Sequence, residues 1–452
     1  MLKTLGAQIK EFKKDSFLTP VFMILEVLME TIIPLMMASI IDNGVEAGDI
    51  HHIYVMGGCM VIVACISLFA GTMGGKYGAR ASAGFARNLR KAMYENIQTF
   101  SFSNIDKFST AGLVTRLTTD VTNLQNAYQM LLRMCVRAPI SLICAMIMAF
   151  FINARLASVY LIAVIVLGMI LAIITVRAHH YFMEVFPKYD DLNASVQENV
   201  SAIRVVKAYV REDYEKKKFT QASKNIYNMF VKAEGVLAFN SPVMQIAVYS
   251  CIIALSWLGA KMIVAGSLTT GELMSLLTYC MNIMMSLMML SMVFVMLAMS
   301  IASAERICEV LNEKSDITNP ENPVYEVADG SVTFDHVTFR YNKTSDKPIL
   351  DDVNLSIRSG ETIGVIGGTG SSKSSLVNLI SRLYDVSEGA VLVGGKDVRS
   401  YDLDTLRDEV SVVLQNNVLF SGTIYENLRW GDKNATDEEC RHACRLACAD
   451  EF

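Results

Sequence analysis

The sequence predicts an α-helical membrane domain followed by a smaller α/β domain, and three observations predict this fold class. Of the 452 residues, 52% are hydrophobic and 19% are charged, against about 25% charged residues in an ordinary soluble domain. Six apolar stretches of roughly 20 residues, the length that crosses a bilayer, precede residue 300. Short alternating stretches and a glycine-rich loop follow them.

The six predicted membrane spans are separated by gaps of two kinds. The gaps after the first, third and fifth spans are short, whereas those after the second and fourth cover residues 76–131 and 177–241. The long gaps are poor in Gly and Pro, so we expect two long helical hairpins that extend the transmembrane helices. The predicted spans are residues 17–41, 53–75, 132–152, 156–176, 242–264 and 273–298.

The distribution of basic residues predicts which side of the membrane each loop faces. Lys and Arg gather in the N-terminal tail and in the two long gaps, as at Arg80, Arg87 and Arg90, and residues 42–52 have none. By the positive-inside rule, both hairpins and both termini are expected in the cytoplasm. The net charge is only −5, and the basic residues follow the topology, so we do not expect a nucleic-acid partner.

Two carboxylates lie inside the first predicted span. Glu26 and Glu30 are one helical turn apart and therefore share a face of the helix. A carboxylate is costly to bury in a bilayer, so it suggests a functional site, here a polar feature of a substrate cavity. A packing contact with another helix is an equally good interpretation, with Arg133 or Arg137 as the possible partner.

The smaller domain is predicted to begin after a polar linker. We place the membrane domain at residues 1–311, the linker with its two prolines at 312–330, and the α/β domain at 331–452. Strands are expected at 331–341, 349–357 and 361–367, and a helix at 372–384. The glycine-rich loop therefore lies between a strand and a helix, as a phosphate-binding loop does.

The loop reads GGTGSSKSS over residues 367–375. In a phosphate-binding loop, backbone N–H groups and the helix N-terminus face the phosphate oxygens. Lys373 would reach the outer phosphates and the hydroxyl of Ser374 would hold Mg²⁺. The alternative is a glycine-rich turn that binds no ligand. Ser372 stands where the general pattern has glycine, so its side chain is expected to strain the backbone or crowd the phosphates and to weaken binding.

Long segments of the chain resemble half-transporters of the ATP-binding cassette exporter family, bacterial multidrug type. The similar segments are IDKFSTAGLVTRLTTDV (105–121), ENVSAIRVVKAYVREDYEKKKF (198–219), SAERICEVL (303–311) and LQNNVLFSGTIYENL (414–428). The resemblance implies six transmembrane helices and a P-loop nucleotide-binding domain, with ATP and Mg²⁺ as ligands. It also implies coupling helices near residues 106–109 and 211–214 that rest on the nucleotide-binding domains.

The resemblance assigns site residues position by position. Tyr341 matches the aromatic residue that stacks on adenine, and Gln415 matches the glutamine that touches Mg²⁺ and senses the membrane domain. Ser374 and Gln415 would be the metal ligands. The residues that match the phosphate loop or stand within it are Gly367, Gly368, Thr369, Gly370, Ser371, Ser372, Lys373, Ser374 and Ser375.

The same resemblance gives two functional hypotheses. The first is half of a dimeric ATP-driven exporter that moves hydrophobic or amphipathic small molecules, drugs or lipids, out of the cytoplasm or inner leaflet. The second is a degenerate partner subunit of a heterodimeric exporter that binds nucleotide weakly. Ser372 favours a heterodimer over a homodimer, because such a subunit needs a competent partner. The expected location is the plasma membrane, as a multi-pass protein in contact with lipid.

The sequence ends before the positions of the family's LSGGQ signature, its Walker B aspartate–glutamate pair and its switch histidine. The 452 residues as written are therefore not expected to hydrolyse ATP, because no carboxylate is present to orient the attacking water. We expect the chain to be a fragment of a longer protein that contains only the N-terminal part of the nucleotide-binding domain; a shortened, inactive subunit is the alternative.

Overall fold

The computed structural model describes residues 1–341, 347–414 and 417–449. The chain divides into two compact units. The membrane unit contains Met1–Thr99 and Phe108–Lys314, and the nucleotide unit contains Phe100–Lys107 and Ser315–Phe452. Gln415, which the sequence assigned to the metal site, lies outside the described residues.

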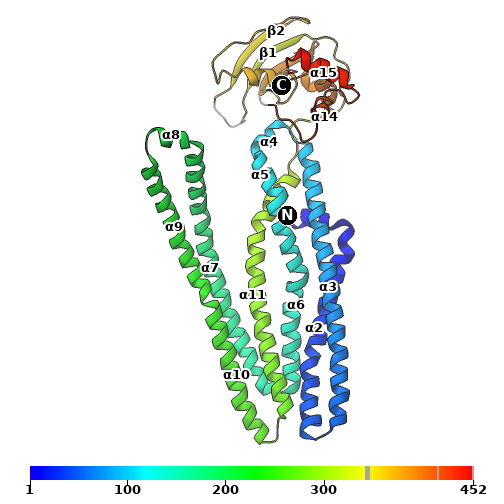
Figure 1. Cartoon of the computed structure of the whole chain (residues 1–452), viewed down its shortest axis with the longest axis vertical. Coiled ribbons are helices and arrows are strands. Elements are labelled where there is room, and N and C mark those ends of the chain that lie inside the picture. Colours follow the sequence, from blue (N-terminus) through cyan, green and yellow to red (C-terminus); the bar gives the residue numbers. More distant parts are fainter. Residues whose placement is uncertain (342–346, 415–416, 450–452) are drawn as a thin grey trace. The chain divides into compact units, whose positions relative to one another are not determined.

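The membrane unit is built from long helices that run along one another (Figure 1). In the described part of the chain, six helical stretches are long and apolar enough to cross a membrane, and each contains or overlaps one predicted span. The six-span prediction is therefore confirmed. The helices of this unit are α1 (Leu2–Gly6), η1 (Ala7–Phe12), α2 (Lys13–Ser39), η2 (Ile40–Glu46), α3 (Ile50–Gln98), α5 (Thr110–Thr115), η3 (Arg116–Asp120), α6 (Val121–Ile152), α7 (Ala154–Ser201), α8 (Ile203–Ala208), α9 (Glu212–Ala238), α10 (Asn240–Val264) and α11 (Thr270–Asn312).

Local sequence signals fix where the long helices begin. Asn153 has an extended backbone, and its side chain accepts hydrogen bonds from the N–H groups of Arg155 and Leu156, which starts α7. Thr269 and Glu272 form a capping box at the start of α11. Each cap satisfies N–H groups that a helix terminus leaves without partners. The two caps therefore mark the short connections between α6 and α7 and between α10 and α11.

The helices of the membrane unit are joined by buried apolar and polar contacts. Tyr160 and Tyr279 are fully buried in the core formed by α6, α7, α10 and α11. The Tyr160 hydroxyl donates to the Leu276 carbonyl at 2.8 Å, and the Tyr279 hydroxyl donates to the Thr31 carbonyl of α2 at 2.6 Å. Both buried hydroxyl groups therefore have a backbone carbonyl as hydrogen-bond acceptor, as buried tyrosines usually do.

The second predicted hairpin is present. Helices α7 and α9 lie side by side, and α8 lies at the turn between them (Figure 1).

A buried carboxylate lies directly before the start of α6. The Asp120 carboxylate accepts hydrogen bonds from Ser303 at 2.9 Å and from the Arg306 Nε at 2.8 Å. This charged contact fixes the start of α6 against α11, because a buried carboxylate without such partners would be costly.

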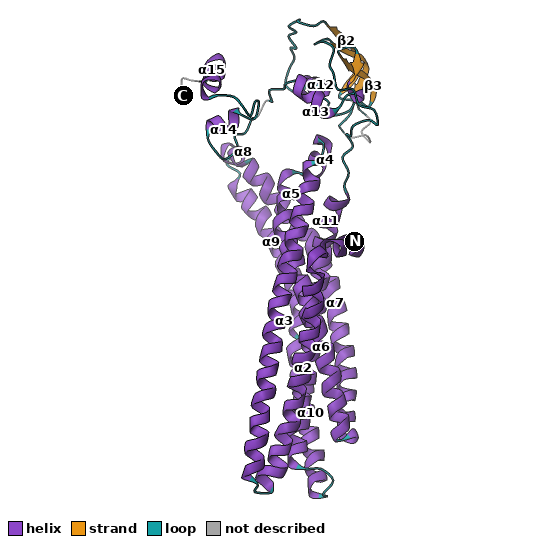
Figure 2. Ribbon diagram, turned by 90° about the vertical axis from the view of Figure 1, so that its right-hand side faces the viewer, coloured by secondary structure: helices purple, strands orange, loops and turns teal. Residues whose placement is uncertain are grey.

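The nucleotide unit contains a four-stranded antiparallel sheet in the order β2-β1-β3-β4. Figure 2 shows α12 and α13 beside the sheet, and their Leu379 and Leu406 join Phe334 and Val391 in one core. The elements of this part of the chain are α4 (Phe102–Phe108), β1 (Val332–Phe339), β2 (Leu350–Ile357), α12 (Lys373–Ile380), β3 (Glu388–Val393), β4 (Lys396–Asp397), η4 (Val398–Ser400), α13 (Leu403–Glu409), α14 (Ile424–Leu428) and α15 (Asp437–Leu446).

The first two predicted strands are confirmed, but the third is wrong for this structure. Residues 361–368 form no ladder, and Ile366 is 98% exposed. A strand obtains its hydrogen bonds from neighbouring strands, and among the described residues none pairs with this segment. The predicted helix at 372–384 is also shorter than expected, since α12 ends at Ile380.

Candidate functional site

The glycine-rich loop lies on the surface and leads directly into α12. Gly367, Gly368, Thr369, Gly370 and Ser371 are all exposed. A Cβ atom at Gly367 would lie 2.5 Å from the Ser371 Oγ, and Gly370 has a φ of +85°. Glycine at these two positions therefore permits the close turn of the backbone that a phosphate-binding loop needs.

Lys373, the first residue of α12, folds back over this loop. Its Nζ atom donates hydrogen bonds to the carbonyl oxygens of Gly367 at 2.9 Å and Gly368 at 2.8 Å, and to the Ser371 Oγ at 3.2 Å. All three acceptors are neutral. A phosphate oxygen carries a charge opposite to that of the ammonium group and attracts it more strongly than a neutral acceptor does, so the ammonium group can exchange these partners for phosphate oxygens.

Ser372 occupies the left-handed region of backbone conformation, with φ +61° and ψ +21°. Non-glycine residues avoid this region because of their Cβ atom, at a cost of about 1–3 kcal/mol in strained sites. The residue is the N-cap of α12, yet its side chain makes no capping hydrogen bond. Ser372 therefore has a backbone conformation that favours glycine, and its effect on nucleotide binding stays a prediction.

The other predicted residues of the site surround the start of α12. Ser374 is exposed in the first turn of the helix, and Ser375 is buried. The Tyr341 hydroxyl lies 2.9 Å from the Ser375 Oγ, and Tyr341 is 45% exposed. The structure thus brings Tyr341 to the helix that follows the loop, with part of its surface available to a ligand.

The donor set fits a nucleotide with its magnesium ion. The loop offers a lysine whose acceptors are neutral, an exposed serine hydroxyl at Ser374, and an exposed backbone at the N-terminus of α12. Lys373 would contact the outer phosphates, and Ser374 would hold Mg²⁺. Within the described ranges, no cluster of three His, Cys, Asp or Glu side chains offers an alternative metal site.

The two carboxylates of the first span meet Arg137 of α6. Arg137 Nη1 donates to the Glu26 Oε1 at 2.7 Å, and Nη2 donates to both Glu30 oxygens at 2.9 Å. The side chains of Glu26, Arg137 and Glu30 are 12%, 29% and 42% exposed. This geometry gives the helix-to-helix contact that the sequence offered as one of its two interpretations, with Arg137 rather than Arg133 as the partner.

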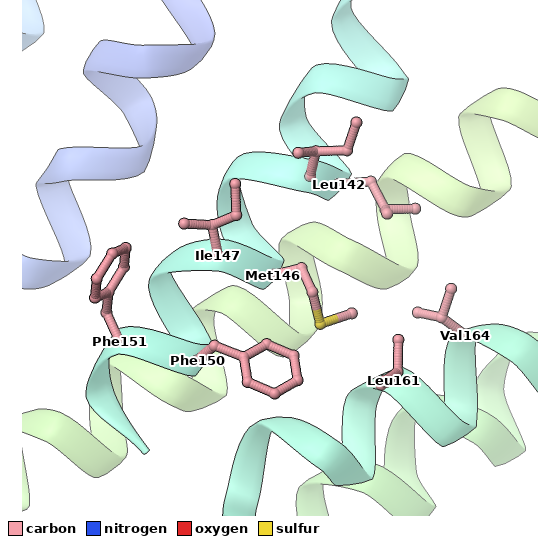
Figure 3. A pocket seen from close by; sticks show the side chains of 8 residues that line it. Leu142, Met146, Ile147, Phe150, Phe151, Leu161 and Val164 are labelled. Atoms are coloured by element: carbon pink, nitrogen blue, oxygen red, sulfur yellow. The ribbon is translucent and has the colours of Figure 1, made fainter. Parts of the chain in front are cut away.

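A wholly apolar groove lies between α6 and α7, with a volume of about 480 Å³. Figure 3 shows Met146 and Phe150 of α6 facing Leu161 and Val164 of α7, while Phe151 points away from them. Every side chain that lines the groove is hydrocarbon or thioether. The groove can therefore accept an apolar chain and offers no polar group to orient a headgroup.

Sequence reasoning missed one residue of the nucleotide unit, Tyr384. Tyr384 lies beside Tyr341, and its hydroxyl donates to the Asp106 carboxylate at 2.8 Å. No motif marks Tyr384, which follows α12 in the run SRLYD. Only the fold places it next to Asp106, in the segment Phe100–Lys107.

Comparison with known proteins gives matches over most of the chain. The family model of the ABC transporter transmembrane region matches residues 16–288, and that of the ABC transporter matches residues 350–450. An uncharacterized ABC transporter ATP-binding protein of Mycobacterium tuberculosis, Rv1273c, is 35% identical over 100% of this chain and 78% of its own length.

Two further relatives match smaller parts of this chain. The uncharacterized ABC transporter ATP-binding protein YfiB of Bacillus subtilis is 33% identical over 94% of this chain and 74% of its own length. A Mycobacterium bovis protein named fatty acid ABC transporter ATP-binding/permease protein is 28% identical over 80% of this chain and 57% of its own length.

Proposed function

Since this chain belongs to the ABC transporter family, we propose that it is half of a dimeric ATP-driven exporter. Its cargo would be hydrophobic or amphipathic small molecules, drugs or lipids, which it would move out of the cytoplasm or the inner leaflet. The family membership is shown by the matches over both parts of the chain. The cargo, the dimer and the direction of transport are our proposals.

One observation carries the proposal: the Lys373 ammonium is held by three neutral acceptors on an exposed loop, in the same chain as six apolar helical stretches. A cation held in this way is available to an incoming phosphate. ATP bound at the loop would then link two such subunits and change the access of a cavity between their membrane helices.

Each residue of the loop has a role in this proposal. Lys373 would neutralise the outer phosphates, and the exposed backbone between Gly367 and Ser371 would turn its N–H groups to the phosphate oxygens. Ser374 and Gln415 would hold Mg²⁺, and Tyr341 would stack on the base. The ion would join the phosphate oxygens and offset their negative charge.

The apolar groove supports the choice of cargo class. The side chains that line this groove between α6 and α7 are all apolar, and a relative carries the name of a fatty acid transporter. We therefore propose an amphipathic molecule with a long apolar part. Glu26 and Glu30 would border the cargo cavity only if their contact with Arg137 opens during transport.

A second candidate function rests on Ser372. Its left-handed backbone costs about 1–3 kcal/mol, so the loop would keep its binding conformation less firmly than one with glycine. A subunit with such a loop would serve as the weak nucleotide-binding partner in a heterodimer. The basic residues of the two hairpins support termini that both lie in the cytoplasm, and the bacterial relatives support the plasma membrane as the location.

The proposed function is tested by transport into inside-out membrane vesicles that contain the natural full-length protein. We expect Mg-ATP to drive the uptake of a labelled long-chain fatty acid or of a hydrophobic dye, and Lys373→Met to abolish this uptake. Uptake that appears only when a second half-transporter is co-expressed would favour the heterodimer. Equal uptake by the natural protein and Lys373→Met would contradict an ATP-driven exporter.

A further inference from the structure

Tyr384 contacts two parts of the nucleotide unit that are far apart in the sequence. Its hydroxyl donates a hydrogen bond to the Asp106 Oδ2 at 2.8 Å. Its ring lies 5.0 Å from the Tyr341 ring at an interplanar angle of 86° and 5.9 Å from the Phe102 ring at 48°. Tyr384 therefore contacts both the first cytoplasmic tip, Phe100–Lys107, and Tyr341.

Tyr341 in turn contacts the helix that follows the phosphate loop. Its hydroxyl lies 2.9 Å from the Ser375 Oγ in α12, the helix that the loop leads into. Its ring is also 4.8 Å from the Phe339 ring at 75°. Edge-to-face contacts of this kind favour defined ring orientations. The position of the Tyr341 ring therefore depends on the rings that border it.

We propose that Tyr384 is a positioning residue that orients the Tyr341 ring for base stacking and ties it to the first cytoplasmic tip through Asp106. The proposal rests on the proposed function, in which Tyr341 stacks on the base of ATP. It adds a specific route by which a movement of the tip changes the affinity for the base while the phosphate contacts of Lys373 stay as they are.

Two properties of the contact support this role. Burial, and after it the hydrogen bond to Asp106, raise the pKa of the Tyr384 hydroxyl, so the hydroxyl stays protonated and remains a donor at physiological pH. Tyr341 and Tyr384 both line a cavity of about 390 Å³. The Tyr341 ring is therefore not packed on every side, and the Tyr384 ring is one of the contacts that limit its orientation.

The test compares two probes that share the phosphate contacts but differ in the base. We would measure the equilibrium dissociation constants of Mg-ATP and of Mg-tripolyphosphate for the natural full-length protein and its variants. Tyr384→Phe and Asp106→Ala each remove one partner of the same hydrogen bond, and Tyr384→Leu removes the ring contact as well. We expect Mg-ATP to bind two- to fivefold more weakly to the first two variants and five- to tenfold more weakly to Tyr384→Leu, with Mg-tripolyphosphate unchanged.

The double variant separates positioning from general damage. Because Tyr384 and Asp106 act through one bond, Tyr384→Phe combined with Asp106→Ala should weaken Mg-ATP binding no more than either change alone. Tyr401→Phe is the matched control, since the Tyr401 hydroxyl donates to the Val393 carbonyl at 2.7 Å rather than to Asp106. It should leave both dissociation constants unchanged.

Three results would overturn the inference. Additive losses in the double variant would show that the two residues act separately. Equal weakening of both probes would indicate general damage to the unit, and unchanged Mg-ATP binding would show that the contact has no role. If the natural protein bound neither probe, the proposed function would fail, and this inference would fail with it. That outcome is distinct from a natural protein that binds ATP and variants that bind it equally well.

Discussion

Each of the two units contains a cation that donates hydrogen bonds, but the acceptors are carboxylates in one unit and neutral groups in the other. In the membrane unit, Arg137 is bound by the carboxylates of Glu26 and Glu30, at 2.7 and 2.9 Å. In the nucleotide unit, Lys373 is bound by two backbone carbonyls and one hydroxyl. Arg137 is therefore paired with groups of opposite charge, whereas the acceptors of Lys373 are uncharged.

This difference distinguishes a structural charge from one that is ready for a ligand. An anion that approached Arg137 would have to displace two carboxylates, and their negative charge would repel it. A phosphate that approached Lys373 would replace neutral acceptors with charged ones and gain stronger hydrogen bonds. The comparison therefore predicts that changes at Arg137 affect stability and that changes at Lys373 affect ligand binding.

The largest effect is expected from Arg137→Met. The change leaves two carboxylates without their cation inside the membrane unit, and breaking such a partly buried pair should cost about 3 kcal/mol of unfolding free energy. Thermal unfolding in detergent micelles measures this loss as a lower Tm. Arg155→Met, at an exposed position at the start of α7, is the control and should change the Tm little. An unchanged Tm in Arg137→Met would contradict the structural role assigned to Arg137.

Lys373→Met should have the opposite profile. Loss of the ammonium group removes its charged hydrogen bonds to phosphate, and the affinity for Mg-ATP should fall about a hundredfold, or ~2.7 kcal/mol. The Tm should change little, because the three acceptors of Lys373 are exposed and can bond to water. Isothermal titration measures the affinity, with Lys396→Met on β4 as the matched control. A Lys373→Met protein that bound Mg-ATP normally would show that the loop is only a turn.

The nucleotide unit also contains a charge pair that we expect to be structural, formed by Asp397 and Arg399. Burial by itself would raise the pKa of Asp397, but hydrogen bonds from the Arg399 side chain and backbone outweigh it and hold this pKa below its usual range. The unfolded chain binds the proton more readily, so the pair stabilises the fold above about pH 4. This stabilisation is lost as the pH falls through the lower pKa of the folded state.

Asp397→Asn should therefore lower the unfolding free energy at pH 7 by about 2 kcal/mol and leave the Mg-ATP affinity unchanged. The stability difference between the natural protein and the variant should shrink as the pH is lowered below 4. Denaturant titrations at several pH values, followed by circular dichroism, measure both effects. A difference that grew with acid would contradict the assigned role of this carboxylate.

The sequence predicted the two units to different extents, for physical reasons. A helix satisfies its own backbone hydrogen bonds, so the length of the apolar stretches was enough to predict the six spans. A strand depends on neighbours from elsewhere, which is why the prediction at 361–367 failed while those for β1 and β2 were correct. Lys373 and Ser372 followed from a local motif, whereas the contact between Tyr384 and Asp106 joins positions that only the fold brings together.

The central claim is that the loop binds Mg-ATP and that Ser372 weakens this binding. Glycine holds a left-handed backbone without strain, so Ser372→Gly should keep more of the protein in the binding conformation and tighten binding about tenfold, or ~1.4 kcal/mol. The measurement is an equilibrium titration of the natural full-length protein and Ser372→Gly with Mg-ATP, with Lys373→Met as the blank. We predict saturable binding to the natural protein and tighter binding to Ser372→Gly. Equal affinities would show that serine does not weaken the loop, and no saturable binding to either protein would contradict the claim as a whole.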